Sequence, residues 1–149
     1  MIELCEVGPR DGLQNEAETL PSATRAELVR RLDATGLRRI EAASFVRDDR
    51  VPQMAGAEAV VAAAGDTTAV LSGLVLNERG YERLAATTLA EAHVTFAATE
   101  SFNHRNANRS VEQSLEAAGA IVARAHADGR RATVTISTAF GCPFEGEVD

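Results

Sequence analysis

The sequence has little of what marks membrane and secreted proteins. No apolar run approaches the ~20 residues that a membrane helix requires, so no membrane partner is expected. The first residues, 1–6, show no basic segment followed by an apolar stretch, so no signal peptide is visible. Two cysteines, Cys5 and Cys142, are too few for a disulfide framework. These absences predict a protein of the reducing cytoplasm.

Positive charge is also scarce. Fifteen Lys and Arg residues stand against 22 Asp and Glu, and the net charge is -7. Proteins that bind nucleic acid neutralise its phosphates with Lys and Arg, so no nucleic-acid partner is expected. Neither Gly-x-Gly-x-x-Gly nor Gly-x-x-x-x-Gly-Lys-[Ser/Thr] occurs, so nucleotide binding through these motifs has no support.

The residues that are present form alternating strand and helix patterns. At 149 residues, with 45% hydrophobic and 25% charged, the chain is expected to be one domain over residues 1–149, with no second domain. Strands are predicted at residues 2–7, 39–45, 69–76, 92–98 and 132–138. Helices are predicted from Pro21 to Gly36, over 56–64, from an N-cap at Asn77 through Leu84, and from a capping box at Ser110 and Gln113 to Gly129.

Strands that alternate with helices predict βαβ units and an α/β fold with a parallel sheet. Two architectures compete at this point: an open doubly wound sheet and a (βα)8 TIM barrel. About five strands are visible, whereas a closed barrel typically has ~250 residues and at least ~200. A barrel of this length would be incomplete.

Polar residues at the carboxyl ends of the strands are the candidates for function, because ligands of parallel α/β sheets bind there. Arg10 and Asp11 lie in a Pro-Arg-Asp-Gly turn. This segment is either a simple turn or an acid for a hard cation beside a planar cation for a carbonyl or enolate oxygen. Glu41 lies inside an apolar strand, either as a paired structural carboxylate or as a general acid or base.

The histidines and Cys142 are weaker candidates. His93, His104 and His126 show no ligand spacing such as His-x-His, so none is assigned to a metal. Cys142 lies in a Gly-Cys-Pro turn with no histidine near it in sequence, which favours a small packed thiol over a nucleophile.

Four segments resemble one known family. Residues 6–16, Glu-Val-Gly-Pro-Arg-Asp-Gly-Leu-Gln-Asn-Glu, look like the first-strand signature of 3-hydroxy-3-methylglutaryl-CoA lyases. These enzymes belong to a metallolyase superfamily with an Asp-Arg-Glu site. The resemblance continues in Ile-Glu-Ala-Ala-Ser-Phe-Val at 40–46, in Val-Pro-Gln-Met at 51–54 and in Gly-Cys-Pro-Phe-Glu-Gly at 141–146.

The resemblance implies a TIM barrel that cleaves a branched hydroxyacyl-CoA to acetyl-CoA and acetoacetate, with Mg²⁺ or Mn²⁺ as cofactor. It implies that Asp11 is a metal ligand, that Arg10 stabilises the enolate oxygen and that Glu41 is the essential second-strand acid. Asn106 falls in a region that lines the acyl-CoA channel of the family. Gln14 and Ser44 are expected to frame the site.

Other residues of the family have no counterpart in this sequence. They are the His-x-His and the Asn that complete the metal site, and a catalytic Cys late in the chain. The expectation is therefore the amino-terminal part of a barrel, about the first five βα units, that is inactive alone. An open sheet edge predicts a homo-oligomer. Alternatives are an acetyl-CoA-dependent 2-oxoacid synthase of the same superfamily, or a non-catalytic truncated module that oligomerises.

Overall fold

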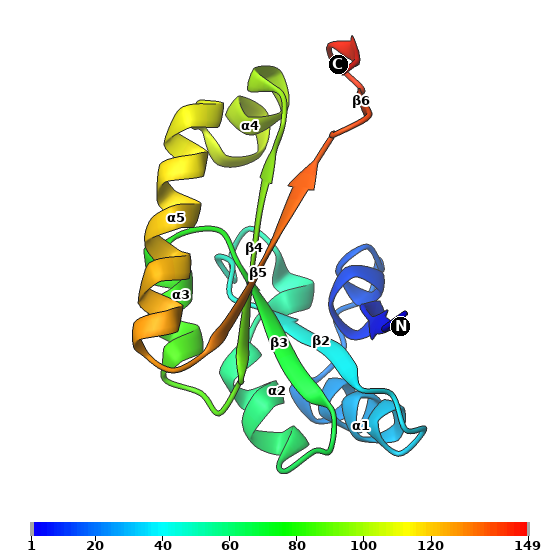
Figure 1. The fold of residues 1–149 in the computed structure, drawn as a ribbon. Coiled ribbons are helices and arrows are strands. Elements are labelled where there is room, and N and C mark those ends of the chain that lie inside the picture. The colour runs from blue at the N-terminus through cyan, green and yellow to red at the C-terminus, as the bar shows by residue number, and fades with distance from the viewer. Residues whose placement is uncertain (1, 149) are drawn as a thin grey trace.

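A computed structural model describes residues 2–148 and contains a parallel sheet of five strands in the order β1-β2-β3-β4-β5. The strands are β1 (Cys5–Glu6), β2 (Arg39–Ser44), β3 (Val70–Val75), β4 (Glu91–Ala97) and β5 (Arg131–Ser137). Each strand pairs with the next one along the chain, whereas a doubly wound sheet reverses its strand order. Figure 1 shows the sheet curled, with helices on its outer side. The fold is half of a TIM barrel, as the sequence predicts.

The helices are α1 (Ser22–Asp33), α2 (Ala57–Ala64), α3 (Glu78–Ala85), α4 (Glu100–Ala107) and α5 (Val111–Ala127). The cap predicted at Asn77 is confirmed, because its Oδ1 accepts a hydrogen bond of 2.9 Å from the Gly80 N–H. The capping box is also confirmed. Ser110 Oγ accepts from the Gln113 N–H at 3.1 Å, and Gln113 Oε1 accepts from the Ser110 N–H at 3.0 Å.

Two local predictions are wrong. The first strand has two residues, not six, and the side chains of Ile2 and Leu4 are exposed, because the sheet pairs only Cys5 and Glu6 with β2. The segment after β4, for which no helix is predicted, is helix α4. Its one buried residue is Asn103, so the segment has no apolar period for sequence reasoning to detect.

A hydrophobic core lies between the outer face of the sheet and the helices. Ile40, Tyr81, Leu84 and Ile121 are almost completely buried in it. β5 is covered less well, with Val134 46% and Ile136 52% exposed. The Gly-Cys-Pro-Phe-Glu-Gly segment folds back as a hairpin of β6 (Gly141–Cys142) and β7 (Gly146–Glu147).

The two edges of the sheet differ in length. β1 offers two residues at one edge, whereas β5 offers seven at the other. Within the described residues, β5 pairs only with β4. None of the helices between residues 2 and 148 combines the length and the apolar character needed to cross a membrane.

Candidate active site

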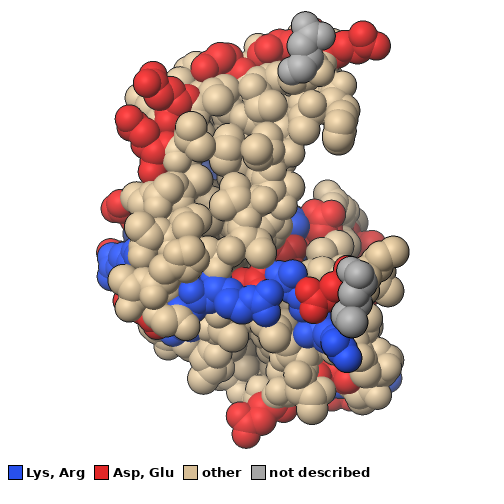
Figure 2. Space-filling view, viewed as in Figure 1, with Lys and Arg blue, Asp and Glu red and all other residues tan. Residues whose placement is uncertain are grey.

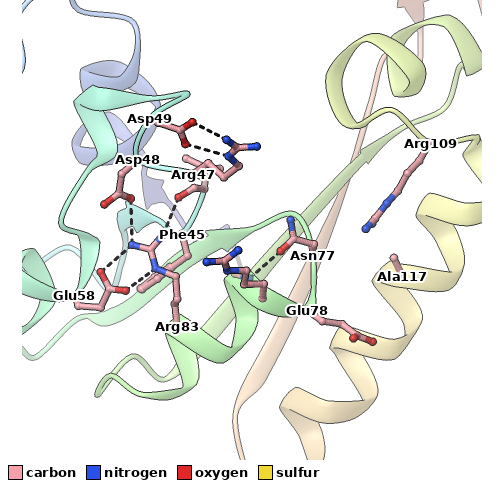
Figure 3. A pocket seen from close by; sticks show the side chains of 13 residues that line it. Phe45, Arg47, Asp48, Asp49, Glu58, Asn77, Glu78, Arg83, Arg109 and Ala117 are labelled. Carbon is pink, nitrogen blue, oxygen red and sulfur yellow. Dashed lines mark hydrogen bonds and ion pairs between the residues drawn. The ribbon is translucent and has the colours of Figure 1, made fainter.

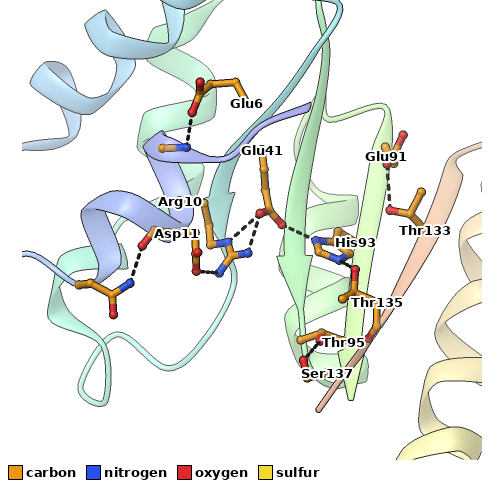
Figure 4. Close-up of polar contacts among 12 residues, drawn as sticks. Glu6, Arg10, Asp11, Glu41, Glu91, His93, Thr95, Thr133, Thr135 and Ser137 are labelled. Atoms are coloured by element: carbon orange, nitrogen blue, oxygen red, sulfur yellow. Dashed lines mark hydrogen bonds and ion pairs between the residues drawn. The ribbon is translucent and has the colours of Figure 1, made fainter. Parts of the chain in front are cut away.

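Arg10 and Asp11 are positioned by a single π-helical turn, η1 (Gly8–Gly12), that follows β1 directly. The N–H groups of both residues donate to the Val7 carbonyl, at 3.1 Å and 2.7 Å. Glu6 Oε1 accepts from the Gly8 N–H at 2.6 Å and holds the entry to the turn. The predicted turn therefore exists, and it places Arg10 beside the inner face of the sheet (Figure 4).

Glu41 lies on β2 with only 1% of its side chain exposed. Its Oε2 accepts from Arg10 Nε at 2.8 Å and lies 2.7 Å from the second terminal nitrogen of the same guanidinium. The remaining terminal nitrogen of Arg10 donates to Asp11 Oδ1 at 2.7 Å. The partner of Glu41 is thus Arg10 and not its sequence neighbour Arg39, which bonds to Glu91. Three of the predicted site residues meet in one cluster.

The cluster has a fourth member, His93, which sequence reasoning did not select. His93 Nδ1 lies 2.5 Å from Glu41 Oε1, and its Nε2 lies 2.8 Å from Thr135 Oγ1. His93 is 52 residues from Glu41 in sequence, so no motif spacing joins them. The period-2 alternation of β4 could have placed His93 on the inner face, but the strand register that brings it to Glu41 is known only from the structure.

The surroundings of Glu41 favour its charged form. Burial alone raises the pKa of a carboxyl group, but the hydrogen bond from His93 and the positive charge of Arg10 outweigh it and lower the pKa of Glu41 below its ordinary value. Both carboxylate oxygens have partners. Glu41 is therefore a buried, ionised group with fixed orientation.

The other three predicted residues lie in different surroundings. Ser44, at the end of β2, is fully buried, and its Oγ has no hydrogen-bond partner among the described residues. Gln14 follows η1, and its Oε1 is likewise buried without a partner within residues 2–148. Asn106 lies exposed on α4. The buried asparagine of that helix is Asn103, whose amide bonds to the backbone N–H and carbonyl of Ala97.

Asp11 is chemically suited to bind a divalent cation, because its side chain is 55% exposed and offers carboxylate oxygens. However, no cluster of three or more His, Cys, Asp or Glu side chains able to hold a metal occurs in the part of the chain that the structure describes. Mg²⁺ requires near-octahedral coordination by six ligands. Asp11 can supply one ligand, and the described residues do not complete the site.

A row of hydroxyl groups continues the polar surface along β4 and β5. Thr95 Oγ1 donates to the Thr135 carbonyl at 3.1 Å and lies 3.2 Å from Ser137 Oγ. Glu91 lies two residues before His93 on β4 and accepts a hydrogen bond from Thr133 at 3.0 Å. Figure 2 shows the molecule hollowed between its carboxyl-terminal end and the amino-terminal segment. Polar side chains therefore continue beyond Glu41 on β4 and β5.

A groove of about 1310 Å³ lies apart from this cluster, and none of the predicted site residues lines it (Figure 3). Arg83 is one of the residues that line this groove. Its guanidinium donates to Glu58 at 2.6 Å and 3.0 Å, to Asp48 at 3.2 Å and to the Val46 carbonyl at 2.8 Å. These bonds tie the loop after β2 to α2 and α3. The contacts of Arg83 therefore support a structural role.

Cys142 is buried, and its Sγ accepts a hydrogen bond of 3.2 Å from Thr99 Oγ1. The hydrogen bonds of His93 run to Glu41 and Thr135, and the ion pair of His104 runs to Glu100. Both histidines are thus bonded to residues other than Cys142, which favours a packed thiol over a nucleophile.

The model of the HMGL-like family matches residues 1–149. The chain belongs to the HMGL-like family. Curated relatives include (R)-citramalyl-CoA lyase of Chloroflexus aurantiacus, 40% identical, and hydroxymethylglutaryl-CoA lyase of Pseudomonas mevalonii, 39% identical. Each match covers 99% of this chain, and this chain spans about half of each relative, 50% and 49%.

Solved structures of family members superpose closely on this one. The hydroxymethylglutaryl-CoA lyase of Pseudomonas aeruginosa gives a TM-score of 0.93 at 40% identity, covering 99% of this chain and 50% of that one. An HMG-CoA lyase of Acinetobacter baumannii in complex with coenzyme A and 3-methylmalate gives 0.92 at 30% identity, covering 100% of this chain and 49% of that one. The half-barrel thus corresponds to half of a TIM-barrel lyase.

Proposed function

We propose that the chain is the amino-terminal part of a (βα)8 lyase, residues 1–149, that cleaves 3-hydroxy-3-methylglutaryl-CoA to acetyl-CoA and acetoacetate. The observation that carries the proposal is the Arg10–Glu41 pair on the inner face of the half-barrel, at the carboxyl end of β1. A buried carboxylate and a planar cation in contact are suited to a reaction that moves a proton while negative charge develops on an oxygen.

The cleavage places two demands on the protein. A proton must leave the tertiary hydroxyl of the substrate, and the thioester enolate that departs must be stabilised. Arg10 meets the second demand, because preorganised donors at a developing oxyanion are worth about 10²–10³ in rate each. A divalent Mg²⁺ or Mn²⁺ bound to Asp11 and to ligands outside these 149 residues would lower the pKa of the substrate hydroxyl.

The remaining predicted residues take binding roles in this proposal. Ser44 and Gln14 would frame the site, with Ser44 Oγ and Gln14 Oε1 buried behind its surface and without partners within the described part of the chain. Asn106 would line the channel for the acyl-CoA. We further propose a cytoplasmic homo-oligomer as the working form.

The identity of the acyl group has two candidates. The Chloroflexus relative is named for citramalyl-CoA and the Pseudomonas mevalonii relative for hydroxymethylglutaryl-CoA, at nearly equal identity to this chain. The names of all these relatives are those of lyases, which favours cleavage over the synthase alternative.

The proposal is tested by providing, on a second polypeptide, the strands that would complete the barrel. The chain is co-expressed with the carboxyl-terminal half of the Pseudomonas mevalonii lyase, and acetoacetate is measured from hydroxymethylglutaryl-CoA with Mg²⁺ or Mn²⁺. The carboxyl-terminal half alone is the control. Activity of the pair supports the proposal, whereas a soluble pair that cleaves neither this substrate nor citramalyl-CoA contradicts it.

Asp11 is tested in the same pair. Asp11→Ala should lower activity by about 10²-fold and weaken metal binding, since even residues that only support metal ligands cost about 10–100-fold when changed. Metal activation is titrated for both proteins. Unchanged activation by Mg²⁺ in the variant would show that Asp11 is not a ligand.

A further inference from the structure

The contacts of Glu41 determine which nitrogen of His93 carries a proton. Oε2 of Glu41 is occupied by two N–H groups of Arg10, and Oε1 faces His93 Nδ1 at 2.5 Å. An ionised carboxylate only accepts hydrogen bonds, so Nδ1 must be the donor. In the neutral imidazole the other nitrogen, Nε2, is then an acceptor, and the Thr135 hydroxyl at 2.8 Å donates to it.

In this series of hydrogen-bonded side chains, His93 and Thr135 are accessible to solvent and the Glu41 carboxylate is not. Glu41 is 1% exposed, whereas the side chain of His93 is 18% exposed and Thr135 is an exposed residue of β5. A substrate on the inner face would therefore meet His93 and Thr135 before it could reach Glu41. The order carboxylate, imidazole, hydroxyl matches the arrangement by which an acid orients a histidine base in other enzymes.

We propose that His93 accepts the proton of the substrate hydroxyl through Nε2, and that Glu41 acts through His93 by fixing its Nδ1–H tautomer. The inference rests on the proposed lyase function for its substrate, but the tautomer is a property of this chain alone. Arg10 has a second task in this arrangement, because its two bonds to Oε2 leave only Oε1 for the imidazole.

The proposed step balances as follows. The O–H bond of the tertiary alcohol breaks, and its proton passes to Nε2 in place of the Thr135 hydrogen bond. The oxygen forms the ketone of acetoacetate while the carbon–carbon bond breaks, and its electron pair leaves as the enolate of the acyl-CoA thioester. The enolate then takes up one proton at carbon from water, which gives acetyl-CoA. His93 Nε2 releases its proton to water, so the reaction consumes no net proton. The imidazolium formed in the step lies against the Glu41 carboxylate, which stabilises it.

The first experiment reads the tautomer directly. His104→Gln and His126→Gln are combined, so that His93 is the only imidazole, since the chain has three histidines. Both replaced residues are exposed. Solid-state ¹⁵N NMR of histidine-labelled protein at about pH 8 distinguishes protonated from unprotonated ring nitrogens whatever the size of the assembly. We expect a protonated Nδ1 and an unprotonated Nε2. A protonated Nε2 with unprotonated Nδ1 would overturn the proposal.

The Glu41→Gln substitution tests, by the same measurement, whether Glu41 sets the tautomer of His93. Arg10 can only donate, so the amide oxygen of the new side chain must face Arg10, and its NH₂ group must face Nδ1. The expected result is reversal to the Nε2–H tautomer. Thr135→Val is the matched control. It removes the partner of Nε2 and should leave Nδ1 protonated; a reversal in this variant would mean that Thr135, and not Glu41, sets the tautomer.

The second experiment measures catalysis in the pair with the carboxyl-terminal half. His93→Gln should lower kcat about 10²-fold or more, within the range for loss of a general base, and leave KM within about threefold. His126→Gln is the control and should keep the parental kcat. A parental kcat in His93→Gln would overturn the catalytic role. An inactive parental pair would contradict the proposed function instead, and the NMR result would stand independently of it.

Discussion

Glu41 is a buried carboxylate whose charge is stabilised by the neighbouring side chains of Arg10 and His93. Removing a carboxylate from water costs several kcal/mol, and the cost is offset only where geometry and hydrogen bonding are complete. Arg10 and His93 occupy both oxygens, and they come from η1 and from β4. A single side chain thus joins the first turn of the chain to the middle of the sheet. Changes at Glu41 should affect stability as well as activity.

The lowered pKa of Glu41 predicts how stability depends on pH. A carboxyl group whose pKa is lower in the folded state contributes stability above its unfolded pKa, about 4.3, and loses it as the pH falls through the folded value. Between about pH 6 and pH 3, the native chain should therefore lose more stability than Glu41→Gln. The limiting difference in slope for one proton is about 1.4 kcal/mol per pH unit.

Urea unfolding of both proteins across this range provides the measurement. Glu27→Gln is the control, because Glu27 also has a lowered pKa, from its hydrogen bonds to Arg31 and Arg30. Its side chain is 43% exposed on α1, where solvent screens the interaction. Its pH dependence should stay close to that of the native chain. Parallel curves for the native chain and Glu41→Gln would show that Glu41 titrates alike in the folded and unfolded states.

Arg10 should not be replaceable by lysine. Arg10 donates two N–H groups to Glu41 and one to Asp11. A single ammonium group cannot reproduce this planar arrangement of donors. In the active pair, Arg10→Lys should lower kcat by about 10²–10³ while KM stays near the native value. Steady-state kinetics separates the two constants. An effect confined to KM would mean that Arg10 only holds the substrate.

At the scale of elements, the start of α3 is packed too closely for a side chain at Gly80. A Cβ there would lie 2.8 Å from the backbone carbonyl oxygen of Phe45, which follows β2. Gly80→Ala should therefore lower the free energy of unfolding, by about 1–3 kcal/mol as for other overpacked sites. Gly119 is the matched glycine, because it is exposed in α5 and a Cβ added there would meet open space.

Gly119→Ala should raise the free energy of unfolding by about 0.5–1 kcal/mol, because alanine favours the helix. Chemical denaturation of the two variants beside the native chain compares them directly. The same sign for both substitutions would contradict the close approach of α3 to the end of β2.

Most elements of this fold could be predicted from the sequence, because their apolar periods and caps are local. Asn77 and the Ser110–Gln113 pair mark helix starts through side-chain bonds that span three residues. The ends of β1 and the whole of α4 could not be predicted. β1 is limited by its pairing with β2, and α4 is held by the Asn103 side chain rather than by an apolar stripe.

The residues of the candidate site likewise divide into those that the sequence predicts and those that only the structure reveals. Arg10 and Asp11 are neighbours in a turn, so the sequence pattern brings them together without knowledge of the fold. Glu41 stands out as an acid in an apolar strand, but its pairing with Arg10 depends on the parallel arrangement of β1 and β2. His93 could not be found, since only the register across β2, β3 and β4 brings it to Glu41.

At the scale of the whole molecule, the long edge at β5 predicts self-association of the isolated chain. Val134 and Ile136 are half exposed beside that edge, and unpaired strands with apolar side chains pair with other chains. Sedimentation should give a species larger than a monomer, without lyase turnover. Ile136→Lys should shift the distribution towards monomer, whereas Leu115→Lys, at an equally exposed position on α5, should not. A monomeric native chain would contradict this prediction.

The unequal edges also set the symmetry that such an assembly can have. The two-residue edge at β1 gives a neighbouring sheet little to pair with, so one copy cannot add to the next in a head-to-tail series. Two β5 edges can meet only about a twofold axis, with the strands antiparallel across the contact. Such a contact uses the same surface on both copies and, within residues 2–148, leaves no long edge free for a third. The association therefore closes at a dimer instead of growing into a fibre.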